Sequence, residues 1–91
     1  MPVVRFTRNI QRHVECPEFE AAGTTVRDVL ETYFVSHPRA RGYVLDDQNR
    51  LRPHMAVFVD GNQLIDRDAL SDAVASTAIL DIVQALSGGS K

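Results

Sequence analysis

A single helix-forming stretch, which begins after Thr25, constrains the fold of this chain more than any other segment. Thr25 is a favourable N-cap, and Asp28 stands three residues later, which is close to a capping box. Pro38 cannot continue a helix, so we expect this helix to end near His37. Apolar residues at helical spacing form one stripe along it: Val26, Val29, Leu30, Tyr33 and Phe34. This stripe and one face of a sheet would make the only core.

Two segments before the helix have the pattern of strands. Residues 3–7 alternate, with Val4 and Phe6 on one face, which is typical of a half-buried strand. Residues 17–22 predict a short return strand, in which Phe19 is the best core candidate. The polar residues 8–16 between them are expected to form a connection.

Three further strands are expected after the helix. Residues 54–60 alternate and end in Asp60-Gly61, a hairpin-type dipeptide, so residues 64–65 are predicted to form the short return strand. Residues 78–85 alternate as the final strand. On the core face we expect Met55, Val57, Val59, Leu80 and Ile82. On the opposite face we expect Ala56, Phe58, Ile79, Asp81, Val83 and Ala85.

The remaining connections are polar. We interpret residues 39–42 as a basic turn, 43–45 as a short strand, 46–50 as a turn and 66–75 as an arc anchored by Leu70. Strands on both sides of a single long helix predict an α+β roll, in which a mixed sheet packs on one main helix.

Composition excludes several classes of function. The 91 residues suffice for one domain, with 44% apolar and 24% charged residues and a net charge of −2. The absence of a basic block argues against nucleic-acid binding, and no apolar run approaches the roughly 18 residues of a membrane span. Because Cys16 is the single cysteine and no signal peptide is recognisable, we expect a cytoplasmic protein.

No catalytic or metal-binding constellation emerges from the titratable residues. His13, His37 and His54 are scattered, and Cys16 has no second cysteine at metal-ligand spacing, so we expect no bound metal. Asp46-Asp47 and Asp66-Arg67-Asp68 lie in polar stretches, where carboxylates usually form turns. The chain is therefore predicted not to be an enzyme and to have no cofactor of its own.

Gly88 and Gly89 follow directly after the last apolar strand. One interpretation is a frayed terminus or a linker. The other is a threading tail, because two residues without Cβ atoms can lie flat in a narrow channel and bring a carboxylate to a buried reactive centre.

Several segments resemble a known superfamily. Residues 57–72, with Gly61-Asn62-Gln63-Leu64 and Leu70-Ser71-Asp72, resemble the corresponding part of ubiquitin, and residues 78–89 resemble its last strand and diglycine. Residues 24–30 are similar to the bacterial sulfur carriers, namely the small subunit of molybdopterin synthase, the thiamine sulfur carrier and the carrier of cysteine synthesis. Residues 50–54 are most similar to the last of these. The resemblance implies a β-grasp domain over residues 1–86 and a tail over 87–91.

The resemblance also implies a function as a sulfur carrier. An E1-like enzyme would use ATP to adenylate the carboxylate of Gly89, and a sulfur donor would displace AMP to leave a thiocarboxylate. Gly88 would give clearance in the channel of that enzyme, and a synthase would accept the sulfur. Phe58 and Val83, together with Leu86, would bind these partners.

Ser90-Lys91 departs from the family pattern, in which carriers end at the second glycine. The resemblance implies that a JAMM-type metalloprotease cuts between Gly89 and Ser90. Two alternatives stay open: a protein modifier that forms isopeptide bonds through Gly89, and an interaction module that uses only the Phe58 and Val83 face.

Overall fold

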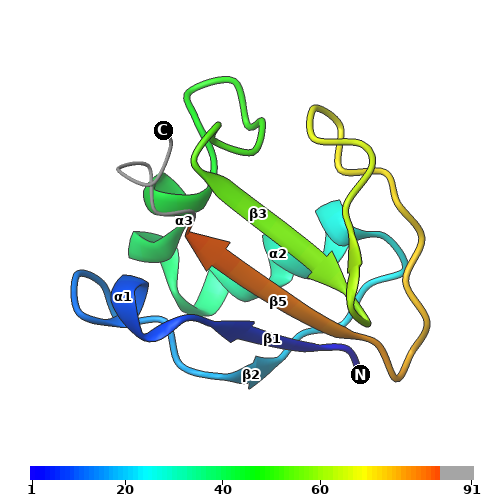
Figure 1. Ribbon diagram of the computed structural model, residues 1–91. Coiled ribbons are helices and arrows are strands. Elements are labelled where there is room, and N and C mark those ends of the chain that lie inside the picture. Colours follow the sequence, from blue (N-terminus) through cyan, green and yellow to red (C-terminus); the bar gives the residue numbers. More distant parts are fainter. Residues whose placement is uncertain (85–91) are drawn as a thin grey trace.

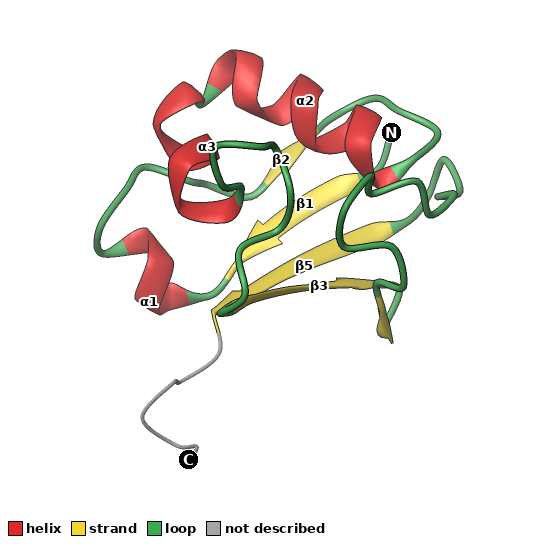
Figure 2. Cartoon of the chain, turned by 90° about the horizontal axis from the view of Figure 1, so that it is seen from above, coloured by secondary structure: helices red, strands yellow, loops and turns green. Residues whose placement is uncertain are grey.

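The computed structural model describes residues 1–84 and shows five strands and three helices. Figure 1 shows a single sheet with the long helix behind it, and Figure 2 shows the helices gathered on one side of the sheet. The elements in chain order are β1 (Val3–Phe6), α1 (Arg8–Gln11), β2 (Phe19–Glu20), α2 (Val26–Ser36), α3 (Pro38–Val44), β3 (Met55–Val59), β4 (Asn62–Gln63) and β5 (Ile79–Gln84).

The sheet is mixed, with strand order β2-β1-β5-β3-β4. The first and last strands are central neighbours and run parallel, with Val4 opposite Leu80. The other three pairs are antiparallel, and Val57 lies opposite Ile82 where β3 meets β5. This arrangement confirms the predicted α+β class with a mixed sheet on one main helix.

The core forms between α2 and the covered face of the sheet, as the apolar patterns predict. The Thr25 hydroxyl accepts a hydrogen bond of 3.2 Å from the backbone N–H of Asp28, and His37 is the C-cap, so both predicted ends of the helix are confirmed. All five residues of the helix stripe are buried. The sheet contributes Val4, Phe6, Met55, Val57, Leu80 and Ile82.

Between β1 and α2 the structure adds one element and corrects one prediction. Residues 8–16 connect β1 to β2 as expected, and residues 8–11 of this connection form a short helix in which Ile10 is buried. The prediction that Phe19 is a core residue is wrong, because its side chain is 41% exposed. Its ring packs edge-on against Tyr33 and His37 at the rim of the sheet, while Cys16 and Ala21 fill the core beside it.

The predicted basic turn and short strand after Pro38 are also wrong, because residues 38–44 form the helix α3. Pro38 stands in the first turn, where its missing N–H costs nothing. Ala40 and Val44, four residues apart, are both buried. Arg41 donates two hydrogen bonds, of 2.6 and 3.0 Å, to the carboxylate of Glu31 and so joins α3 to α2.

The hairpin after β3 forms at the predicted dipeptide. Asp60 and Gly61 have φ angles of 51° and 87°, which suit a turn that favours glycine. The return strand comes earlier than predicted, at Asn62–Gln63, because Leu64 already turns into the core. Leu70 is fully buried and anchors the arc that follows, as expected.

Candidate functional site

The candidate site is the face of the sheet that the helices leave open. Strand register places Arg5, Asp81 and Phe58 in one row across β1, β5 and β3, because Asp81 pairs with both of the others. Val83 pairs with Ala56 in the next row. All these residues alternate with core residues, so their side chains lie on the face opposite α2.

Phe58 and Val83 are both half-buried and line the same shallow depression on this face. Arg5, Thr7, Glu18 and Asp81 are among the other residues that line it. The structure therefore brings together the two predicted docking residues, whose role in binding stays a prediction. Apolar side chains grouped on an open sheet face are typical of a protein-binding surface.

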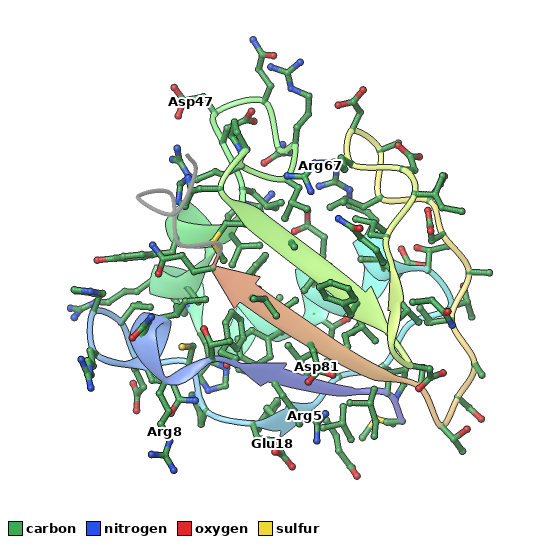
Figure 3. The ribbon with its side chains drawn as sticks, in the orientation of Figure 1. Arg5, Arg8, Glu18, Asp47, Arg67 and Asp81 are labelled. Carbon is green, nitrogen blue, oxygen red and sulfur yellow. The ribbon has the colours of Figure 1, made fainter. Side chains whose placement is uncertain are left out.

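An ion pair in the centre of this face was missed by the sequence analysis. Arg5 donates hydrogen bonds of 2.7 and 3.0 Å to the two carboxylate oxygens of Asp81, and Figure 3 shows these side chains pointing toward each other, with Glu18 nearby. The hydrogen bond to Asp81 raises the pKa of Arg5. No local pattern predicts this pair, because only the parallel register of β1 and β5 brings the two residues together.

A surface pair of this kind adds little to stability, since the side chains of Arg5 and Asp81 are 46% and 34% exposed. Fixed charges beside an apolar patch instead select the orientation and identity of a partner. The ion pair therefore places two fixed, partly exposed charges beside the apolar side chains of the open face.

The strand β5 leads from this face toward the diglycine. Gln84, its last residue, pairs with Met55 at the beginning of β3. Leu86, Gly88, Gly89 and Ser90 lie outside the described residues, as do Ala85 and the predicted domain boundary after residue 86. Their roles stay predictions.

The cysteine and two of the histidines that were considered as reactive or metal-binding groups pack against other side chains of the domain. Cys16 is buried, and desolvation raises the pKa of its thiol, which disfavours the nucleophilic thiolate. His13 stacks on Tyr43, and His37 stacks on Tyr33 with 4.5 Å between ring centroids. Across residues 1–84 there is no group of three or more side chains that could hold a metal ion.

The predicted acidic turn formers are confirmed. The Asp46 carboxylate accepts hydrogen bonds from the backbone N–H groups of Gln48 and Arg50. The Asp66 carboxylate accepts hydrogen bonds from backbone N–H groups of the arc and from the hydroxyl of Ser71. These bonds lower the pKa of Asp66 to about 2, and the largest contribution comes from Ser71.

No helix in the described part of the chain combines the length and the apolar character that a membrane span requires.

No family model matches this chain, and no curated protein sequence matches it. Solved structures do match nearly its whole length. Small archaeal modifier protein 1 from Methanosarcina acetivorans is 19% identical, with a TM-score of 0.78 and coverage of 97% of this chain and 95% of that chain. The BexX/CysO complex of Amycolatopsis orientalis contains a chain that is 19% identical, with a TM-score of 0.82 and coverage of 98% and 100%.

A third match is CysO of Mycobacterium tuberculosis, described as an antigen. It is 16% identical, with a TM-score of 0.80, and the match covers 94% of this chain and 100% of that chain. At such identities the matches show the fold, so the resemblance to ubiquitin-like chains is confirmed at that level.

Proposed function

We propose that this chain is a ubiquitin-like sulfur carrier whose working group is the carboxylate of Gly89. Once Ser90-Lys91 has been removed, an activating enzyme adenylates Gly89, and a sulfur donor converts it to a thiocarboxylate. The chain then donates this sulfur to a biosynthetic enzyme. Its own role is to present the tail and to be recognised, so it needs no catalytic residues.

The observation that carries this proposal is how few residues separate the diglycine from the end of β5 in the sequence. Gly88-Gly89 come only a few residues after Gln84, where β5 ends as the middle strand of the sheet. The same strand carries Asp81 and Val83 on the open face. A partner that holds this face therefore has the start of the tail within reach.

The chemistry requires activation because a carboxylate is a poor electrophile. Attack of a carboxylate oxygen of Gly89 on the α-phosphorus of ATP releases pyrophosphate and leaves an acyl adenylate. The sulfur donor, taken here as hydrosulfide, attacks the acyl carbon through its sulfur, and AMP leaves with the electron pair of the broken C–O bond. Loss of the proton on sulfur then leaves the thiocarboxylate. ATP thus belongs to the activating enzyme and is not a cofactor of this chain.

Three kinds of partner follow from this scheme. An E1-like enzyme activates Gly89, a JAMM-type metalloprotease cleaves the bond between Gly89 and Ser90, and a synthase accepts the sulfur. The solved BexX/CysO complex supports the last of these, since it shows a chain of this fold bound to another protein.

A second function is favoured by the matches to small archaeal modifier proteins. In that case the activated carboxylate of Gly89 would form isopeptide bonds to lysine side chains of other proteins. The same fold, open face and diglycine serve both functions, because both begin with adenylation.

An N-terminally tagged chain expressed in its own cells distinguishes the candidates. A sulfur carrier gives a single band on a denaturing immunoblot, whereas a modifier gives a ladder of heavier conjugates. Deletion of Gly88-Gly89 is the matched control and should abolish the growth or metabolic function of the carrier. Full function of the deleted chain would contradict both candidates and favour a plain interaction module.

A further inference from the structure

The arginines of this chain divide into two groups. Nine lie among the described residues, and six of them make ion pairs or donate side-chain hydrogen bonds, namely Arg5, Arg27, Arg41, Arg50, Arg52 and Arg67. Within residues 1–84, Arg8, Arg12 and Arg39 make neither and are exposed. Their charges are therefore available to a partner.

These three arginines lie at one end of the molecule. Arg8 begins α1 directly after β1, and because β1 runs parallel to β5, α1 lies at the edge where β5 ends. Arg39 belongs to α3, whose last residue, Val44, accepts a backbone hydrogen bond from Arg52 in the segment that leads into β3, and β3 begins at Met55, the partner of Gln84. Figure 3 shows Arg8 extending from α1 away from the tip of β5. The three arginines thus belong to elements at the end of the molecule where β5 ends, and Arg8 points away from the other two.

Arg12 and Arg39 line one open groove together with His13, Glu15 and Tyr43. Tyr43 is 44% exposed, and its ring stacks on His13 with 6.5 Å between centroids. Its hydroxyl donates a hydrogen bond of 3.4 Å to the carbonyl oxygen of His13, which holds the ring in place. Glu15 is the one carboxylate among the residues that line the groove, and it forms no ion pair with them.

Exposed arginine beside an ordered tyrosine is the composition that protein interfaces favour. A guanidinium binds a carboxylate through two parallel hydrogen bonds, so the complementary groups are Asp and Glu side chains. The local excess of positive charge is notable because the whole chain carries a net charge of −2. Charge complementarity therefore indicates an acidic partner surface.

Chain length limits how far from the end of β5 a protein that takes up the tail can lie. Gly89 stands five residues after Gln84. An extended chain spans at most about 3.5 Å per residue, so Gly89 reaches no farther than roughly 17 Å from the end of β5. A protein with Gly89 in its active site must then lie close to the root of the tail.

We propose that the tail-root surface, formed by Arg12, Arg39 and Tyr43, docks an acidic protein surface rich in Asp and Glu on the enzyme that receives the tail. This inference rests on the proposed function. The arginines steer the acidic surface toward the root of the tail, and Tyr43 supplies a rigid contact once docking has occurred.

The test is an NMR titration of the isotope-labelled full chain with a decaglutamate peptide. The expected result is a set of chemical-shift changes at Arg12, Arg39 and Tyr43 that weaken as salt is added. The double variant R12A/R39A should bind at least about tenfold more weakly. A matched control, I65E/A75E, lowers the net charge equally in the arc on the other side of the fold and should bind like the unaltered chain, apart from a small general effect.

Equal binding by R12A/R39A and the unaltered chain would overturn the inference. Tighter binding of a single-stranded RNA of equal charge would also overturn it, because the surface would then recognise phosphate. The yield of thiocarboxylate in the native cells separates this failure from failure of the proposed function. If the unaltered chain and R12A/R39A form the thiocarboxylate equally well, only the tail-root inference fails. If the unaltered chain forms no thiocarboxylate, the carrier function itself is contradicted.

Discussion

Gly23 and Gly42 have opposite roles although both lie near helices. A Cβ atom on Gly23 would lie 2.6 Å from the backbone nitrogen of Val29 and 2.8 Å from the Cβ of Asp28. The chain before α2 therefore approaches the first turn of that helix too closely for any side chain. Gly42, inside α3, has open space where its Cβ would be.

Substitution of these two glycines by alanine should change stability in opposite directions. G23A should lower the free energy of unfolding, because the backbone must shift to relieve the contact with Val29. G42A should raise it by about 0.5–1 kcal/mol, since alanine is the better helix former. Urea unfolding of both variants measures the effect, and a stability of G23A equal to that of the unaltered chain would contradict the close approach.

The ionised carboxylate of Asp66 should stabilise the folded chain, and this contribution should be lost at acid pH. Its folded pKa, about 2, lies below the ordinary value of 3.8, so its contribution is fully present above pH 3.8 and is lost as the pH falls through about 2. D66N lacks this titration. We therefore expect the unaltered chain to be more stable than D66N near neutral pH and the difference to narrow between pH 3.8 and 2. Unfolding curves at several pH values test this, and a constant difference would contradict it.

At the scale of elements, the side chains of two arginines donate hydrogen bonds that hold the long connections against α2 and the start of β3. The Arg27 guanidinium, on α2, donates to the carbonyl oxygens of Asn49, Asp68 and Ala69. The Arg67 guanidinium donates hydrogen bonds of 2.8 Å to the carbonyl oxygens of both Arg52 and Met55. These bonds give the carbonyl oxygens of the connections side-chain donors, although the carbonyl oxygen of Arg52 also accepts a hydrogen bond of 2.9 Å from the backbone N–H of Met55.

Removal of the Arg67 donors should loosen the segment that leads into β3. R67M keeps most of the side-chain volume but leaves the carbonyls of Arg52 and Met55 without this donor, so we expect a loss of about 1–3 kcal/mol. R67K restores one donor group and should recover part of the loss. Urea unfolding measures both variants, and an unchanged midpoint for R67M would show that the carbonyls find other partners.

The elements that the sequence predicted well are those with a long local repeat. The stripe of α2 and the alternation of β3 and β5 depend only on near neighbours, so their faces were assigned correctly. The short helices α1 and α3 form because Ile10, Ala40 and Val44 are buried by distant parts of the chain. The Arg5–Asp81 pair depends on strand order, which no local pattern contains.

At the scale of the whole molecule, one layer of helices covers one face of the sheet and leaves the other face open (Figure 2). Phe58 and Val83 supply the apolar part of that face, and Arg5 with Asp81 supplies its fixed charges. The tail-root surface adds a basic area at the edge where β5 ends. The proposed carrier function thus relies on recognition of the folded domain as well as on a reactive tail.

Loss of the Phe58 ring from the open face should impair formation of the thiocarboxylate at Gly89 without unfolding the domain. F58T keeps a good strand former, and we expect it to lower the yield of thiocarboxylate by about tenfold, as for other central interface aromatics. I65T, at a side chain that is 89% exposed in the arc, is the matched control and should load normally. Normal loading of F58T would indicate that partners bind another face.

The most direct test is the intact mass of this protein purified from its own cells under conditions that preserve thiocarboxylates. The carrier function predicts a species that ends at Gly89 and in which one carboxylate oxygen is replaced by sulfur. The mass increase that this sulfur causes should disappear when the thiocarboxylate is hydrolysed, and it should be absent from a chain without Gly88-Gly89. Retention of Ser90 and Lys91 on every molecule, with no sulfur-bearing species, would contradict the proposed function.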